Sequence, residues 1–189
     1  FRELAAFAAE TGIPFLASPF DADSLGLLLE LGVPAIKLGS GELTDLPLLR
    51  KAAQAGKPLL VSTGMADEWE IAEALQILSS AADPAPLVVL LHAVSCYPCP
   101  PEQANVKAVA TLAERFGRPV GYSDHTLGDA AALAAVALGA VVIEKHLTLD
   151  SRGEGPDHAA SMEPREFETM VRRIREVSPD SQVLVLTSF

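Results

Sequence analysis

The 189-residue sequence has few cysteines, few aromatic residues and no long apolar run. Aromatic residues make up 5% of the chain although 49% of it is hydrophobic, so the core must be built from Ala, Val, Leu and Ile. Such a core suits helices packed closely on a sheet better than an aromatic-rich sandwich. No uninterrupted apolar stretch reaches the roughly 18 residues of a membrane span, and no basic start precedes an apolar segment. We therefore expect a cytoplasmic α/β protein without a membrane partner.

Positive charge is also scarce. The chain has 14 basic and 25 acidic residues, for a net charge of −11, and its basic residues are scattered apart from "RRIR" at 172–175. A nucleic-acid surface needs clustered Lys and Arg, so nucleic acid is not an expected partner. A single domain of this length can bury roughly 70% of the surface that its unfolded chain exposes.

The two cysteines of the chain, Cys96 and Cys99, form a C-x-x-C motif. One interpretation is a redox pair whose first thiol is activated by a following helix N-terminus. However, Pro98, Pro100 and Pro101 delay any helix beyond the second cysteine. We therefore prefer two reduced thiols that pack locally.

A repeated pattern divides the chain into strand and helix units. Glycine, one residue and proline precede an apolar run in "TGIPF", "LGVPA", "AGKPL" and "FGRPV". Glycine suits the position just past a helix end, and the proline that follows can begin a strand. The pattern predicts six strands within 14–20, 34–40, 58–64, 87–95, 119–125 and 141–147. Apolar spacing of three and four predicts helices within 22–31, 44–55, 66–80, 104–116 and 128–138.

The alternation of strands and helices, without hairpin signals, predicts a parallel sheet with right-handed crossovers. We expect the α/β class and a parallel (β/α)8 TIM-barrel type, of which this chain covers about six of the eight βα units. A flavodoxin-like open sheet needs only five or six strands and is the alternative. All six runs become polar at their C-terminal ends, where barrels carry their active sites.

The polar residues at these ends combine phosphate-binding and metal-binding chemistry. "KLGSGE" and "STGM" offer hydroxyls, a lysine and backbone N–H groups to a phosphate. His125 and His146 end neighbouring predicted strands and can share one ion, with water and substrate oxygens filling its other positions. Such a site suits Mn²⁺ or Mg²⁺ better than closed zinc coordination. The alternative is two core histidines with satisfied hydrogen bonds. We place Ser123 and Asp124 on the same functional face as His125.

Several segments together resemble the N-acetylneuraminate (sialic acid) synthase family. They are, in chain order, "FLASPFD", "IKLGSGEL", "LVSTGMA", "YPCPPEQANV", "PVGYSDHTLG", "VIEKHLTLD" and "EGPDHAASMEP". The resemblance runs from Phe1 to about Val177. It implies a (β/α)8 barrel that uses a divalent metal to condense phosphoenolpyruvate with an N-acetylated hexosamine, typically N-acetylmannosamine, and releases phosphate.

The resemblance also implies residue roles. It makes His125 and His146 the metal ligands, and Glu42 and Glu144 the acid/base and substrate-orienting carboxylates. Tyr97 and Asp157 would face the sugar. The residues that would hold phosphoenolpyruvate are Lys37, Ser40, Ser62 and Ser123, with Ser95 near them.

Three alternatives remain open at this point. The chain could belong to a pseudaminic or legionaminic acid synthase, it could be a catalytically incomplete fragment that binds phosphate-bearing ligands, or it could be a metal aldolase that releases no phosphate. The family's first two barrel strands and its C-terminal antifreeze-like domain, which reaches into the site of a homodimer partner, are not in this sequence. We therefore expect a partial catalytic barrel at 1–177, and activity of the isolated chain is in question.

Residues 178–189, "SPDSQVLVLTSF", do not match the family in this comparison of motifs. Their alternation and β-branched residues predict a strand. A partial barrel exposes sheet edges, so we expect this tail to dock on an edge or to pair between chains.

Overall fold

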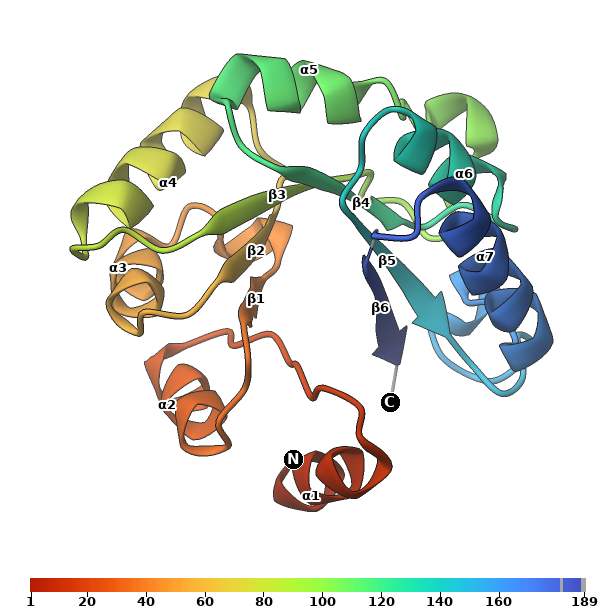
Figure 1. Cartoon of the computed structure of the whole chain (residues 1–189), viewed down its shortest axis with the longest axis horizontal. Coiled ribbons are helices and arrows are strands. Elements are labelled where there is room, and N and C mark those ends of the chain that lie inside the picture. The colour runs from red at the N-terminus through yellow and green to blue at the C-terminus, as the bar shows by residue number, and fades with distance from the viewer. Residues whose placement is uncertain (181, 188–189) are drawn as a thin grey trace. The chain divides into compact units, whose positions relative to one another are not determined.

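The structure is a computed structural model that describes residues 1–180 and 182–187, and it divides into two compact units, Phe1–Val89 and Leu90–Phe189. Figure 1 labels the helices and strands of unit 1 (Phe1–Val89) and unit 2 (Leu90–Phe189). None of the described helices is long and apolar enough to span a membrane.

Unit 1 alternates helices with two parallel strands. Its elements are α1 (Arg2–Thr11), α2 (Ala22–Glu30), β1 (Ile36–Leu38), η1 (Ser40–Glu42), α3 (Leu46–Gln54), β2 (Leu59–Ser62) and α4 (Glu68–Ser80). β1 pairs with β2 in parallel, with Lys37 opposite Leu60. Three helices begin where the sequence places an aspartate, because Asp21, Asp45 and Asp67 each accept a hydrogen bond from an N–H of the first turn.

Unit 2 carries a parallel sheet with helices packed on it (Figure 1). Its first strand, β3 (Val88–Ala93), begins two residues before the unit boundary. The elements that follow are η2 (Pro101–Gln103), α5 (Ala108–Phe116), β4 (Val120–Asp124), α6 (Ala130–Ala137), β5 (Val142–Leu147), η3 (His158–Ala160), α7 (Pro164–Val177) and β6 (Gln182–Thr187). β3, β4, β5 and β6 pair in parallel in chain order.

The strand order distinguishes the two fold classes that the sequence allows. A doubly wound sheet such as that of flavodoxin reverses its strand order at a switch point. The described strands of unit 2 follow one another without a reversal, as in a barrel. The α/β class with TIM-barrel topology is therefore confirmed.

Close packing holds the helices of unit 2 against its strands. Tyr122 and Ile143 are almost fully buried on β4 and β5, and Met170 and Ile174 are fully buried on α7. Gly121 lies on β4 where this strand packs against β5. A Cβ at this position would come 2.5 Å from the carbonyl oxygen of Val142, so the close approach of the two strands requires glycine. These contacts fix the two strands whose ends carry the site.

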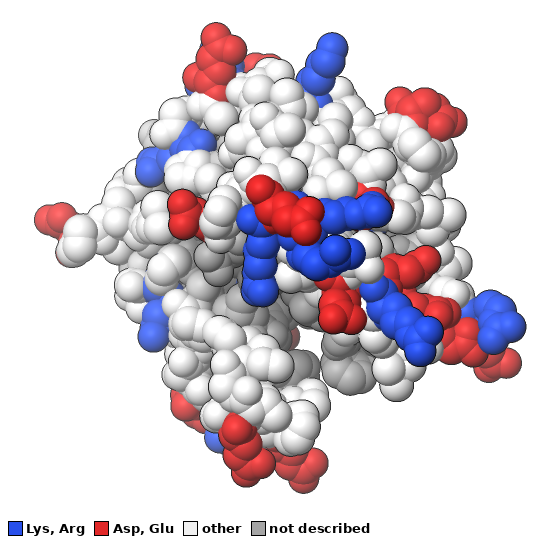
Figure 2. Space-filling model, turned by 45° about the vertical axis from the view of Figure 1, so that its right-hand side comes forward, with Lys and Arg blue, Asp and Glu red and all other residues white. Residues whose placement is uncertain are grey.

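The exposed side of α7 carries the three arginines of the "RRIR" segment, whereas its isoleucine is buried. Arg173 forms an ion pair with Asp129 at 2.8 Å, and Arg172 lies 3.9 Å from Glu176. Figure 2 shows basic side chains interleaved with acidic ones on the face that it draws. The segment therefore serves local ion pairs on a helix surface.

The structure corrects one strand prediction. Five of the six expected runs contain β1 to β5, but residues 14–20 form no strand. Pro14 and Pro19 lie within this run, and neither can donate a backbone hydrogen bond to a ladder. The strand expected in the tail is observed as β6, which pairs with β5 from Gln182 to Thr187. The remaining tail residues 181, 188 and 189 lie outside the described part.

Candidate active site

The site in unit 2 is built on the C-terminal ends of β4 and β5. These strands pair with Ser123 opposite Glu144 and Asp124 opposite Lys145. Successive side chains of a strand point to opposite faces of the sheet, so each pair shares a face with its cross-strand neighbour. Ser123 and Glu144 are joined by a hydrogen bond on one face, and Asp124 and Lys145 by an ion pair on the other.

Two histidines follow on the face of Ser123 and Glu144. The ring centroids of His125 and His146 lie 5.6 Å apart, with an angle of 65° between the rings. Burial lowers the pKa of both imidazoles below the ordinary value, and for His146 the neighbouring His125 adds to the effect. Both rings are therefore neutral near pH 7, which is the form that binds metals.

The hydrogen bonds of His125 fix its tautomer. Nδ1 lies 2.7 Å from the carbonyl oxygen of Val94, which can only accept, so Nδ1 carries the hydrogen. In the neutral ring Nε2 then holds the lone pair. Nε2 lies on the side of Ser123, whose Oγ is 3.5 Å away. A backbone carbonyl that orients a histidine in this way is typical of metal-binding imidazoles.

Ser123 and Glu144 form a short, buried hydrogen bond beside the histidines. The Ser123 hydroxyl donates to Glu144 Oε1 at 2.6 Å, a distance typical of a hydroxyl bound to an ionised carboxylate. Both side chains are almost completely buried. The carboxylate is therefore held in one orientation, with its charge close to His125 and His146.

Tyr97 covers both histidines from the loop after β3. Its ring centroid lies 4.1 Å from that of His125 and 5.9 Å from that of His146. The loop is tied to β4 because the backbone N–H of Cys99 donates to His125 O at 2.8 Å. Burial raises the pKa of the Tyr97 hydroxyl, with further contributions from the charges of Asp157 and Glu144. Tyr97 is still 46% exposed, so it can contact a ligand as well as the histidines.

The predicted residues Asp157 and Ser95 come from loops. Asp157 lies between β5 and α7, and its Oδ2 is 3.9 Å from His146 Nδ1. This distance is too long for a hydrogen bond and short enough for an electrostatic interaction. Ser95 lies two residues before Tyr97 and is exposed. Cys96 and Cys99, in the same loop, are free thiols, as expected.

Four predicted residues lie in unit 1. Buried Lys37 donates from Nζ to Ser62 Oγ at 2.9 Å and to Leu38 O at 3.3 Å. Ser40 begins η1 and Glu42 ends it. A Cβ at Gly39 would overlap the Glu42 carboxylate, so this loop needs glycine for Glu42 to fold back over it. The structure thus brings Lys37 to Ser62 and Glu42 to the "KLGSGE" backbone.

Asp124 lies at the C-terminal end of β4, as predicted, but its side chain does not join those of Ser123 and His125. Its side chain is fully buried and paired at 2.8 Å with Lys145, whose side chain is also fully buried. Thr126 donates to Asp124 Oδ1 through its N–H and its hydroxyl, and Lys145 also donates to Thr126 O. Strict strand alternation would have revealed this pair in the sequence, because Asp124 and Lys145 each stand one position from the residues of the site.

The donor set fits a divalent metal with open coordination positions. The described residues contain no group of three or more His, Cys, Asp and Glu arranged to hold a metal. A closed structural site needs about four protein ligands. Two neutral imidazoles instead leave positions for oxygen atoms of water and substrates, an arrangement suited to Mn²⁺ or a similar ion.

Comparisons with known proteins extend over nearly the whole chain. It is 50% identical over 177 residues to the uncharacterized protein MJ1065 of Methanocaldococcus jannaschii, covering 94% of this chain and 52% of that protein. It is 47% identical to the N,N'-diacetyllegionaminic acid synthase of Campylobacter jejuni, covering 93% of this chain and 53% of that protein. The chain thus spans about half the length of these curated relatives.

A solved structure supports the same relationship. The N-acetylneuraminic acid synthetase of Leptospira borgpetersenii, crystallised with citrate, superposes with a TM-score of 0.87 at 37% sequence identity, covering 94% of this chain and 61% of that one. The sequence matches the NeuB family over residues 1–182. With its parallel βα units and the paired strand ends described above, this chain belongs to the NeuB family of sialic acid and related nonulosonic acid synthases.

Proposed function

We propose that this chain supplies the metal-binding and acid/base residues for the condensation of phosphoenolpyruvate with an N-acetylated hexosamine. The observation that carries the proposal is the pair of neutral imidazoles, His125 and His146, beside the Ser123–Glu144 hydrogen bond. The products are a nonulosonic acid and phosphate. N-acetylmannosamine is the proposed sugar.

His125 and His146 would hold the divalent ion, Mn²⁺ or Mg²⁺. When bound there, the ion would polarise the aldehyde of the sugar as a Lewis acid. Tyr97 and Asp157 surround His146 on the open side of the site and would orient the sugar. The exposed part of the Tyr97 ring offers an apolar surface and a hydroxyl to the sugar.

Glu144 would act where charge develops on phosphoenolpyruvate. In the reaction, the enol carbon bonds to the aldehyde carbon while the aldehyde oxygen takes up a proton. Water then adds to the resulting cationic carbon and gives up a proton, and the C–O bond to phosphate breaks to leave a ketone and inorganic phosphate. A buried carboxylate can stabilise that cation and take a proton from the water. Ser123 holds Oε1 in place at 2.6 Å, which preorganises the carboxylate for this role.

The unit 1 residues would bind phosphoenolpyruvate. Lys37 would supply a positive charge, and its hydrogen bond to Ser62 Oγ at 2.9 Å supports assigning both polar groups to the same ligand. Within unit 1, Ser40 is a further proposed ligand and Glu42 a second substrate-orienting carboxylate. In unit 2, exposed Ser95 is a proposed ligand, whereas Ser123 could donate to a substrate only by turning its one hydroxyl hydrogen away from Glu144. A lysine and several hydroxyls are a common environment for a phosphate.

A related sugar is the second candidate. The Campylobacter jejuni relative at 47% identity is an N,N'-diacetyllegionaminic acid synthase, and this supports a diacetylated hexosamine as the second candidate sugar. A pseudaminic acid precursor belongs to the same class. Comparing kcat/KM for the three sugars decides among them.

The test has a binding arm and a turnover arm. Isothermal titration of this chain with Mn²⁺ should show one site, which His125→Asn and His146→Asn abolish. His92→Asn is the matched control, because His92 is a buried histidine of the same unit that bonds to Ala104 O. Unchanged Mn²⁺ binding in both site variants would contradict the metal assignment.

Turnover is measured on the complete encoded protein. Phosphate release from phosphoenolpyruvate should require both an N-acetylhexosamine and a divalent ion. Release without sugar, or full activity in excess chelator, would argue against the condensation. Sugar consumption without phosphate release would indicate a metal aldolase. Mn²⁺ binding but no turnover by this chain, beside turnover by the complete protein, would indicate a fragment that binds but lacks catalytic parts.

A further inference from the structure

The segment between β5 and α7 forms a closed loop over residues 148–163. At its base, Met162 donates to His146 O and Thr148 donates to Met162 O, each at 2.9 Å between backbone atoms. Ser151 adds a second closure, since its hydroxyl and N–H donate to Glu163 Oε1 at 2.9 and 3.2 Å. The loop therefore leaves β5 beside His146 and returns to the same place.

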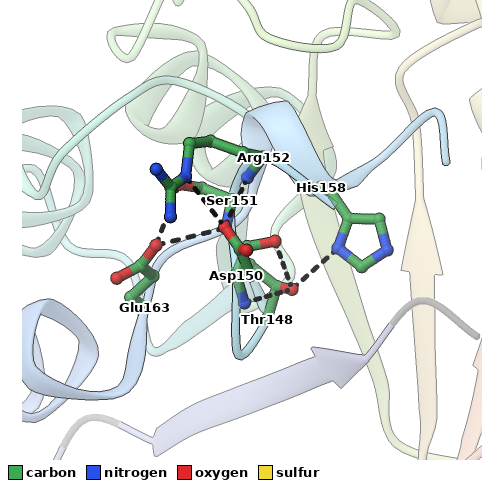
Figure 3. A network of polar contacts seen from close by, with 6 residues as sticks. All are labelled: Thr148, Asp150, Ser151, Arg152, His158 and Glu163. Carbon is green, nitrogen blue, oxygen red and sulfur yellow. Dashed lines mark hydrogen bonds and ion pairs between the residues drawn. The ribbon is translucent and has the colours of Figure 1, made fainter. Parts of the chain in front are cut away.

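The imidazole of His158 occupies the inside of this loop. Its Nδ1 lies 2.7 Å from the hydroxyl of Thr148, which also contacts the backbone of Asp150 (Figure 3). Two glycines allow the backbone to lie against the ring. A Cβ at Gly153 would be 3.2 Å from His158 Nδ1, and one at Gly155 would be 3.0 Å from Cδ2. Gly155 also has a φ of 139°, a backbone conformation that residues other than glycine rarely adopt.

Asp157 precedes His158 directly, so the position of the ring constrains the position of this carboxylate. Asp157 O accepts hydrogen bonds from Ala160 N and Ser161 Oγ at 3.0 and 2.8 Å, and Ser161 N donates to His158 O at 3.1 Å. The turn is thus fixed on one side by η3 and on the other by the His158–Thr148 contact. The Asp157 carboxylate extends from it to 3.9 Å from His146.

We infer that His158 is a positioning residue: through Thr148 and the two glycines it holds Asp157 at the sugar-binding side of the site. The inference rests on the proposed function, because it assigns His158 an effect on the sugar that Asp157 orients. His158 itself need not touch a substrate. The expected consequence of its loss is weaker sugar binding with unchanged phosphoenolpyruvate binding.

The test uses a double-mutant cycle on the complete protein. His158→Ala should raise KM for the sugar about tenfold, the equivalent of one hydrogen bond, and leave KM for phosphoenolpyruvate unchanged. His158→Asn, which can still bond to Thr148, should recover most of the loss. In an Asp157→Ala background, His158→Ala should have no further effect, because it acts through that carboxylate. Arg152→Ala, on the same loop with an exposed side chain, is the control and should leave both KM values unchanged.

A physical measurement separates this inference from the proposed function. Amide hydrogen exchange at Ala160 and Ser161 in this chain should accelerate in His158→Ala and recover in His158→Asn. If the wild-type protein has no sugar-dependent activity, the proposed function fails and exchange still decides whether His158 holds the turn. Unchanged exchange overturns the inference. Equal effects of His158→Ala with and without Asp157 also overturn it.

Discussion

The buried ion pair beneath the site offers a quantitative test of how β4 and β5 are held together. Lys145 Nζ lies 2.8 Å from Asp124 Oδ2, and neither side chain has any exposed surface. The pair joins neighbouring strands at the positions between Ser123 and His125 and between Glu144 and His146. Removing one charge leaves the other buried with no solvent exposure.

The expected cost follows from the contacts that remain. Loss of one partner of a buried pair typically costs about 3–5 kcal/mol, out of a total domain stability of about 5–15 kcal/mol. In Lys145→Met, Asp124 keeps two hydrogen bonds from Thr126, so we expect a loss of about 3 kcal/mol. Asp124→Asn leaves an ammonium group with the carbonyl of Thr126, and we expect a loss nearer about 5 kcal/mol.

The double variant Asp124→Asn/Lys145→Met tests the coupling. It removes both charges and keeps an acceptor for Thr126. Its decrease in unfolding free energy should therefore be smaller than the sum of the decreases in the two single variants, by about 2 kcal/mol or more. Urea unfolding followed by tyrosine near-UV circular dichroism reports unit 2, because both tyrosines, Tyr97 and Tyr122, lie there. Trp69 fluorescence reports unit 1 in the same sample.

A surface pair of the same unit is the control. Arg173 and Asp129 are also 2.8 Å apart, but their side chains are 51% and 20% exposed, so Arg173→Met should cost less than about 1 kcal/mol. If the double variant loses the full sum of the single losses, the two charges are not coupled. The account of the pair would then be refuted.

Three further predictions concern packing, pH and the tail. Gly121→Ala should lower the melting temperature of unit 2 sharply, since its Cβ would meet the Val142 carbonyl at 2.5 Å and overpacking costs about 1–3 kcal/mol or more. Burial lowers the pKa of His92 below 6.5, so it stabilises the fold above that pH, and this contribution is lost as the pH falls. The unfolding free energy of His92→Asn should therefore fall less steeply below pH 6.5 than that of the wild type, and parallel curves would contradict this. Deleting residues 181–189 removes β6 from the edge of β5 and should reduce folded protein, measured as soluble yield. An unchanged yield would show that β5 is stable without β6.

Much of the fold is predictable because short stretches of the sequence determine where helices and strands begin and end. Asp21, Asp45 and Asp67 stand where helices begin, and the apolar runs that contain β1 to β5 are bounded by glycine and proline. The parallel pairing of the strands follows from the absence of hairpin signals, but their order does not, because a flavodoxin-like sheet meets the same condition. Residues 14–20 show the limit of this approach, because apolar composition alone does not supply the N–H groups that Pro14 and Pro19 lack.

The candidate site was predictable only as a set of strand ends. Which residues meet depends on the register between β4 and β5. This register pairs Ser123 with Glu144 and Asp124 with Lys145. His158 was not predicted as a site residue, because its contacts with Thr148 and Gly155 come from a loop with no periodic pattern. The glycines of "RGEGPDH" were the available signal, since they allow a backbone to close around a ring.

The alternation at the ends of β4 and β5 explains why charged residues can lie so close to neutral histidines. Glu144, Lys145 and His146 are consecutive, yet the lysine turns away and is neutralised by Asp124 on the other face. The face of the histidines keeps the Glu144 carboxylate, which Ser123 orients, and the Asp157 carboxylate lies 3.9 Å from His146. A divalent cation placed there would meet two neutral nitrogen donors and a nearby negative charge, with the lysine charge already compensated. The buried pair would therefore help this face to hold the proposed cation, because Asp124 offsets the charge of Lys145 on the other face of the sheet.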